Sequence, residues 1–139
     1  MRKILLLLAI AAIALSACGR KEPPQAIADG APPTLISVEH AVAGNSLKLD
    51  IKMSGGSRGI GFQIDRAEID PHCNCPSMWR RHYEELPHAA NFKRPSIPQL
   101  INLKSHKTGY AFRVRAIDSL GRFSDWSPTI RARAEEFFQ

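Results

Sequence analysis

A short segment in the middle of the chain concentrates side chains that could bind a metal or form a disulfide. Residues 70–78 read Asp-Pro-His-Cys-Asn-Cys-Pro-Ser-Met. His72, Cys73 and Cys75 offer imidazole and thiolate groups, which zinc and copper favour. Two cysteines one residue apart cannot complete a tetrahedral site alone, and the histidine spacing matches no common zinc finger. In an oxidising compartment we first expect a Cys73–Cys75 disulfide, with free or intermolecular thiols and a metal site as alternatives.

Catalysis receives little support from the sequence. His72 and Cys73 are adjacent, and adjacent side chains of an extended strand point to opposite faces, so they do not form a thiol and base pair. The two pairs of glutamates, at 84–85 and 135–136, are also adjacent, which is typical of solvated surface. No glycine-rich phosphate loop follows a strand and opens a helix. We therefore expect no catalytic residues and no cofactor, and hence no enzyme.

The third cysteine ends an apolar segment at the N-terminus. Residues 1–3 are short and basic, residues 4–15 are apolar, and Ser16, Ala17 and Cys18 follow. A helix of this length spans about 18 Å, less than the roughly 30 Å hydrocarbon core of a bilayer. The segment therefore predicts a secretory signal peptide and not a transmembrane helix.

The end of this segment, Leu15-Ser16-Ala17-Cys18, resembles the lipobox of bacterial lipoproteins. The resemblance implies cleavage after residue 17, a diacylglycerol on the Cys18 thiol and an acylated amine. Such an anchor is stable, because each buried CH₂ group contributes about 0.8 kcal/mol. In enterobacterial lipoproteins, an aspartate directly after the lipidated cysteine resembles a signal for retention in the inner membrane. This chain has Gly19 at that position, which favours the outer membrane. The alternative is a soluble secreted protein with a free terminal thiol.

Composition and charge exclude several other classes of protein. The 139 residues, 44% hydrophobic and 23% charged, predict one globular domain. The net charge is +6, but the basic residues are scattered, so we expect no nucleic-acid partner. Four prolines and the lack of a hydrophobic period in residues 18–33 predict an extended tether.

Alternating apolar and polar residues predict β-strands from residue 34 onward. The clearest strand is 47–53, where leucine, isoleucine and methionine alternate with lysine and aspartate. Similar segments lie at 34–40, 60–65, 82–86, 100–103, 110–117 and 129–134. No segment has a helical period. The pattern predicts an all-β protein, an immunoglobulin-like antiparallel β-sandwich over residues 34–134, with a short tail at 135–139.

Two of these segments resemble fibronectin type III domains. Residues 110–121, Tyr-Ala-Phe-Arg-Val-Arg-Ala-Ile-Asp-Ser-Leu-Gly, are similar to the sixth strand and following loop of that family, and residues 60–64 to its third strand. The resemblance implies a sandwich of about seven strands. It also implies a tyrosine corner at Tyr110, in which the hydroxyl bonds to the backbone upstream. The chain departs from the family at Ile51, where tryptophan is usual, and in the turn before Tyr110, which differs in length and lacks the usual proline.

A second resemblance follows in the chain. Residues 123–127, Phe-Ser-Asp-Trp-Ser, are similar to the Trp-Ser-any-Trp-Ser box of cytokine-receptor fibronectin domains, where the box stacks on arginines of the neighbouring strand. The expected members of such a ladder are Arg113, Arg115, Trp126, Arg131 and Arg133. Each cation–π contact contributes about 0.5–2 kcal/mol. The ladder either only stiffens a sheet face or also forms an aromatic and basic face for a ligand.

Together these features predict a lipid-anchored, non-catalytic module of the bacterial cell envelope that binds a protein or a surface. The exposed candidates for partner binding are Trp79, Arg80, Arg81 and Tyr83, because aromatic and arginine side chains dominate binding energies. Alternatively, these residues form an edge strand whose rings cover the core. Two other functions stay open: a periplasmic metal or redox protein using the Cys73/Cys75 loop, and a structural subunit of an envelope assembly.

Overall fold

The computed structural model describes residues 30–56 and 58–135. The predicted signal peptide at 1–17, the predicted lipidation site Cys18 and most of the predicted tether lie outside these residues. Within the described ranges, no helix is long and apolar enough to cross a membrane.

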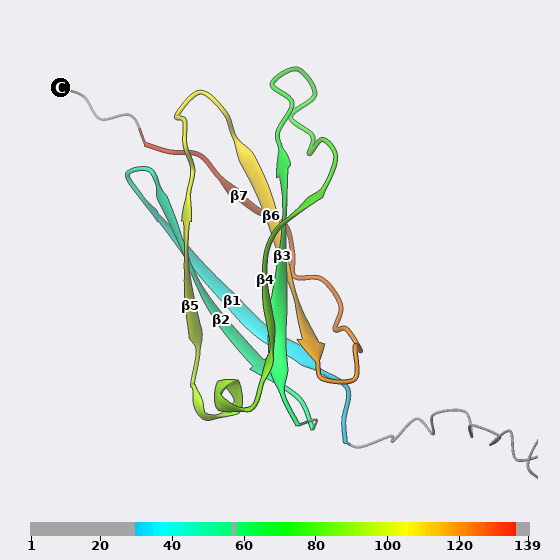
Figure 1. Cartoon of the computed structure of the whole chain (residues 1–139). Helices are drawn as coiled ribbons and strands as arrows, with labels where there is room; N and C mark the ends of the chain where they lie inside the picture. Colours follow the sequence, from blue (N-terminus) through cyan, green and yellow to red (C-terminus); the bar gives the residue numbers. More distant parts are fainter. Residues whose placement is uncertain (1–29, 57, 136–139) are drawn as a thin grey trace, which may run out of the picture.

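Seven strands and one short 3₁₀ helix make up the described part of the chain. They are β1 (Thr34–Ala43), β2 (Ser46–Ser54), β3 (Ile60–Glu68), β4 (Arg80–His88), η1 (Ala89–Lys93), β5 (Ile97–Asn102), β6 (Tyr110–Asp118) and β7 (Ile130–Ala132). The strands form two antiparallel sheets, ordered β1-β2-β5 and β4-β3-β6-β7 (Figure 1). The predicted all-β, antiparallel sandwich of about seven strands is confirmed.

The core lies between the two sheets and follows the alternation of the sequence. β2 contributes Leu47, Leu49 and Ile51, all completely buried, so isoleucine fills the place where the resembled family usually has tryptophan. β3 and β6 face them with a further set of buried side chains. These are Phe62, Ile64, Tyr110, Phe112 and Val114. Each strand therefore turns one face inward, as period-2 patterning requires.

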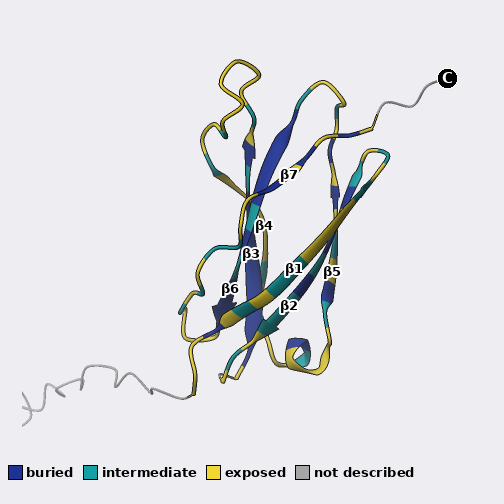
Figure 2. Ribbon diagram, turned by 180° about the vertical axis from the view of Figure 1, so that it is seen from behind, coloured by how far each residue is buried: buried dark blue, intermediate teal, exposed yellow. Residues whose placement is uncertain are grey.

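The two central strands of the larger sheet are buried on both faces. Figure 2 shows β3 almost entirely in the colour of buried residues, whereas β1 has many exposed positions. The outward positions of β3 include Gln63 and Asp65, which are only 4% and 7% exposed. Burial of polar side chains on an outer face means that another layer covers this sheet.

A loop after β6 fixes the start of the domain. The buried Asp118 carboxylate accepts hydrogen bonds from the backbone N–H of Leu120 and of Arg122 and from Arg122 Nε, at 2.7–2.9 Å. Arg122 Nη1 and Nη2 donate to the carbonyl oxygens of Gly30 and Ala31, both at 3.3 Å. Burial raises the pKa of Asp118, but the hydrogen bonds from this loop outweigh it and lower the pKa below 3.8. The loop thus clamps the residues that lead into β1.

Candidate binding surface on the four-stranded sheet

The segment of residues 123–127 is held against β6 by its serines. The backbone N–H groups of Ser124 and Ser127 donate to the carbonyls of Ala116 and Val114, at 3.0 and 2.7 Å. In return, the N–H groups of Ala116 and Val114 donate to the hydroxyls of Ser124 and Ser127, at 2.9 and 3.0 Å. Hydroxyl oxygens thus replace backbone carbonyls as acceptors for β6. This pairing lets the segment lie beside β6 without being a regular strand.

The aromatic rings of this segment form a ladder with the arginines of β6. The Arg115 guanidinium carbon lies 3.8 Å from the ring centre of Phe123 and 4.3 Å from that of Trp126. The Arg113 guanidinium carbon lies 4.2 Å from Trp126 and 4.5 Å from Trp79. All four distances are within the range of cation–π attraction. We call these five residues the ladder: Phe123, Arg115, Trp126, Arg113 and Trp79.

Polar side chains of β3 accept hydrogen bonds from the two ladder arginines, and an arginine of β4 bonds one of these acceptors. Arg115 Nε donates to Gln63 Oε1 at 2.9 Å, and Arg113 Nη2 donates to Asp65 Oδ2 at 3.1 Å. Arg81 Nε donates to the other Asp65 oxygen at 2.8 Å. Both guanidinium planes of the ladder are therefore fixed by stacking and by hydrogen bonds at the edge. This layer explains why the outer face of β3 is buried.

The charges around Asp65 favour its ionised form. Burial raises the pKa of Asp65, but hydrogen bonds from Arg81 and Arg113 and their positive charges outweigh burial, so the pKa lies below 3.8. The pKa of Arg115 is lowered by burial and by the positive charges of Arg81 and Arg113. Arg115 stays protonated at neutral pH, because a guanidinium does not lose its proton in proteins. At neutral pH the site thus holds the Asp65 carboxylate and the arginine guanidiniums in their charged forms.

Sequence reasoning found the centre of the ladder and missed its extent. Arg113, Arg115 and Trp126 lie together as expected. The inclusion of Arg131 and Arg133 was wrong. β7 pairs with β6 only at residues 110–112, which places its arginines beyond the box, and Arg131 Nη1 instead donates to Asn74 Oδ1 at 3.1 Å.

Arg133 lies beside Gly109, where its guanidinium is 3.5 Å from the place a Cβ would take.

Sequence reasoning also missed the two buried acceptors of the ladder, Gln63 and Asp65. The alternation that points Phe62 and Ile64 inward could have identified Gln63 and Asp65 as outward neighbours of the β6 arginines.

The residues proposed for partner binding divide between two faces. Trp79 is half-buried and ends the ladder, and Arg81 bonds Asp65 and also Glu84. Tyr83 instead packs its ring 5.7 Å from that of Phe62 and so covers the core. Arg80 is exposed at the start of β4. β4 is thus an edge strand, with the Trp79 ring on the outer face of the sheet and the Tyr83 ring on the core face.

Tyr110 occupies the position of the corner tyrosine at the start of β6. The ring is buried and lies 5.1 Å below the Arg66 guanidinium. Among the described residues, no hydrogen bond joins the Tyr110 hydroxyl to the backbone upstream. The turn before β6 differs from that of the resembled family, and its residue Lys104 lies in the left-handed region at φ 53°.

The Cys73 and Cys75 sulfurs form a disulfide, as expected. The loop is closed by Asp70, whose N–H donates to the Cys75 carbonyl at 2.9 Å and whose Oδ1 accepts from the His72 N–H at 2.7 Å. Bonded sulfurs are not thiolate ligands. Across residues 30–56 and 58–135, no three His, Cys, Asp or Glu side chains are placed to hold a metal ion. The alternative set of His72, Cys73 and Cys75 is therefore not assembled.

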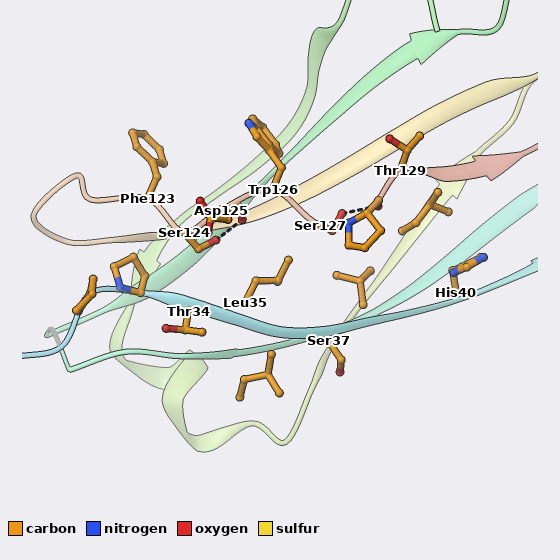
Figure 3. A pocket seen from close by; sticks show the side chains of 16 residues that line it. Thr34, Leu35, Ser37, His40, Phe123, Ser124, Asp125, Trp126, Ser127 and Thr129 are labelled. Atoms are coloured by element: carbon orange, nitrogen blue, oxygen red, sulfur yellow. Dashed lines mark hydrogen bonds between the residues drawn. The ribbon is translucent and has the colours of Figure 1, made fainter. Parts of the chain in front are cut away.

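A groove of about 570 Å³ runs between β1 and the segment that carries the box (Figure 3). Its β1 wall includes Leu35, Ile36 and Val38, and its other wall runs from Phe123 to Ile130. Figure 3 shows the rings of Phe123 and Trp126 pointing away from β1, toward the outer face of the larger sheet. The groove and the ladder are therefore neighbouring surfaces that share one segment of chain.

Comparisons with known proteins identify the fold and no family. A scan of family models found no match. No curated protein matches the sequence. Among solved structures, one described as "Myokine structure" is similar with a TM-score of 0.52 and 22% identity, over 76% of this chain and all of that chain. At this identity the similarity shows the shared β-sandwich alone.

Proposed function

We propose that this chain is a lipid-anchored, non-catalytic module of the bacterial envelope that binds a protein partner. The observation that carries the proposal is the ladder. Its tryptophan and arginine side chains belong to the residue types that dominate protein interfaces. Stacking and hydrogen bonds fix them before a partner arrives, which reduces the entropy lost on binding.

The ladder also leaves surface for a partner to cover. Phe123 is 44% exposed at one end of the stack, while Trp79 at the other end and Trp126 in the middle are half-buried. A partner that covers these rings removes apolar surface from water, at roughly 25 cal/mol per Å². It also desolvates the cation–π contacts, which strengthens them. The same residues that stiffen the sheet thus provide a binding surface.

Cross-linking in cells tests the binding role. A photoreactive amino acid replaces Asp125, which is exposed between the two ladder rings of the box, and in a control chain it replaces Leu100, which is 68% exposed on the other sheet. We expect a protein adduct from position 125 and none from position 100. A chain that forms no protein adduct from position 125 contradicts the proposal.

Labelling with radioactive palmitate tests the anchor. The Cys18→Ala chain should take up no label and should keep the size of the precursor. A chain with both Cys73→Ala and Cys75→Ala is the control and should be labelled like the unmodified protein, because its lipobox is intact. Equal labelling of the Cys18→Ala chain contradicts a lipid anchor at that residue.

A further inference from the structure

Arginines outside the ladder extend its charge across the larger sheet. Arg131 lies directly opposite Ala111 in the pairing of β6 with β7, while the next pair joins Tyr110 to Ala132. Tyr110 and Ala132 are buried, so Arg131 and Arg133 project from the outer face, on the same side as the ladder. The arginines of this outer face are Arg81, Arg113, Arg115, Arg131 and Arg133.

The carboxylates that pair with these arginines do not cancel their charge. Asp65 bonds Arg81 and Arg113 from beneath the ladder, and Glu84 bonds Arg81 at 2.6 Å. Within the part of the chain that the structure describes, Arg131 donates its hydrogen bond to the neutral Asn74, and Arg133 is exposed. The five arginines thus exceed the two carboxylates that pair with them. This excess of guanidinium groups over paired carboxylates lies toward β6 and β7.

The opposite outer face shows that this charge is local. On the three-stranded sheet, Lys48 pairs with Asp50 at 3.1 Å and Lys52 pairs with Glu39 at 3.2 Å. These two lysines are the only ones within the strands of the described residues. All cations on the strands of the larger sheet are therefore arginines, which a uniformly basic surface would not show.

The choice of arginine indicates the kind of partner. A guanidinium binds a carboxylate through two parallel N–H groups, whereas an ammonium acts as a point charge. Arginine and tryptophan are enriched in protein–protein interfaces, where lysine is depleted. We infer that the outer face of the four-stranded sheet binds an acidic segment of a protein partner, whose carboxylates bond Arg115, Arg131 and Arg133. This inference rests on the proposed protein-binding function.

A binding experiment tests the inference. A fluorescently labelled peptide of about twelve glutamates is titrated with the full chain at low ionic strength, and binding is measured by fluorescence anisotropy. We expect the double variant Arg131→Gln/Arg133→Gln to bind at least about tenfold more weakly, which is about 1.4 kcal/mol. The control is Lys48→Gln/Lys52→Gln, which removes the same charge from the other sheet. Its affinity should stay within about twofold of the unmodified chain, because the lysines lie on the opposite face.

Three results would overturn the inference. They are equal weakening by both double variants, no binding of the peptide by the unmodified chain, and binding to phosphatidylglycerol vesicles in place of the peptide. If position 125 still cross-links to a protein in any of these cases, the proposed function stands and only the acidic partner is excluded. If that cross-link is absent as well, the proposed function fails too.

Discussion

The two outer faces of the sandwich use charged residues in different ways. On the three-stranded sheet, lysines pair with carboxylates across the surface, and the side chains of Lys52 and Glu39 remain 42% and 69% exposed. On the four-stranded sheet, Asp65 forms ion pairs with Arg81 and Arg113, although its side chain is only 10% exposed. Arg113 also stacks on the ring of Trp126. Exposed pairs are worth about 0–1 kcal/mol, whereas desolvated cation–π contacts reach about 2 kcal/mol each.

This difference shows that one sheet carries a third layer of side chains. The outward residues of β2 alternate in burial with its core residues, so that face of the strand meets water directly. The outward residues of β3 are buried almost as deeply as its inward ones. The arginines and rings above β3 thus act as packing as well as charge. Substitutions on the two faces should therefore differ in cost.

The largest effect is expected for Trp126→Ala. The indole lies between two guanidiniums, at 4.2 and 4.3 Å, and its loss removes both contacts and exposes Arg113 and Arg115. We expect the free energy of unfolding to fall by about 2–4 kcal/mol, measured by urea denaturation. Leu100→Ala on the other sheet is the control and should change it by less than about 0.5 kcal/mol. Similar small changes in both variants would mean that the third layer does not stabilise the fold.

A smaller effect is expected for Asp65→Asn, about 1–2 kcal/mol at neutral pH, because two charge-assisted hydrogen bonds are weakened. The pKa of Asp65 is lower in the folded chain than in the unfolded chain. As the pH falls, Asp65 therefore takes up its proton in the unfolded chain before it does so in the folded chain. The stabilisation is complete above about pH 5 and is lost as the pH falls through 3.8 and below.

Urea midpoints measured from about pH 6 down to about pH 2 check this prediction. The unmodified chain should lose more stability over this range than Asp65→Asn. Asp118 also has a lowered pKa and contributes equally to both proteins, so the difference between the two curves belongs to Asp65. Parallel curves would show that the ion pairs of Asp65 contribute nothing to stability.

The smallest effect is expected for Lys52→Gln. Its pair with Glu39, at 3.2 Å, is solvated on the three-stranded sheet. We expect a change below about 0.5 kcal/mol in the same urea measurement, and the change should shrink further in salt. A loss as large as that of Asp65→Asn would remove the distinction between the two faces.

The alternation of apolar and polar residues was sufficient to predict which side chains of a strand face the core and which face outward. The period of two in β2 and β6 placed Leu49 and Phe112 in the core and Arg113 and Arg115 outside, which was enough for the fold and the centre of the ladder. Alternation does not specify the register between strands. Trp79 reaches Arg113 because β3 and β4 pair with an irregularity between Ile64 and Asp65, a feature with no signal in the sequence.

Register also explains the other errors. Arg131 and Arg133 have the spacing of ladder members, but β7 pairs with only three residues of β6. The groove beside β1 was not predicted, because it depends on how far apart the edges of the two sheets lie. Contacts that join distant segments through strand ends and bulges are set by three-dimensional packing, which a local pattern does not contain.

The clamp at Arg122 has a mechanical consequence. An edge strand such as β1 is easily peeled from its sheet when its end is pulled, since its hydrogen bonds then break one after another. Here the residues ahead of β1 are bonded to Arg122, which belongs to the loop of the other sheet, and the Ala31 carbonyl also accepts from Gly56 N–H at 3.1 Å. Tension that arrives at Gly30 is therefore divided between both sheets, and the sandwich resists it as one body.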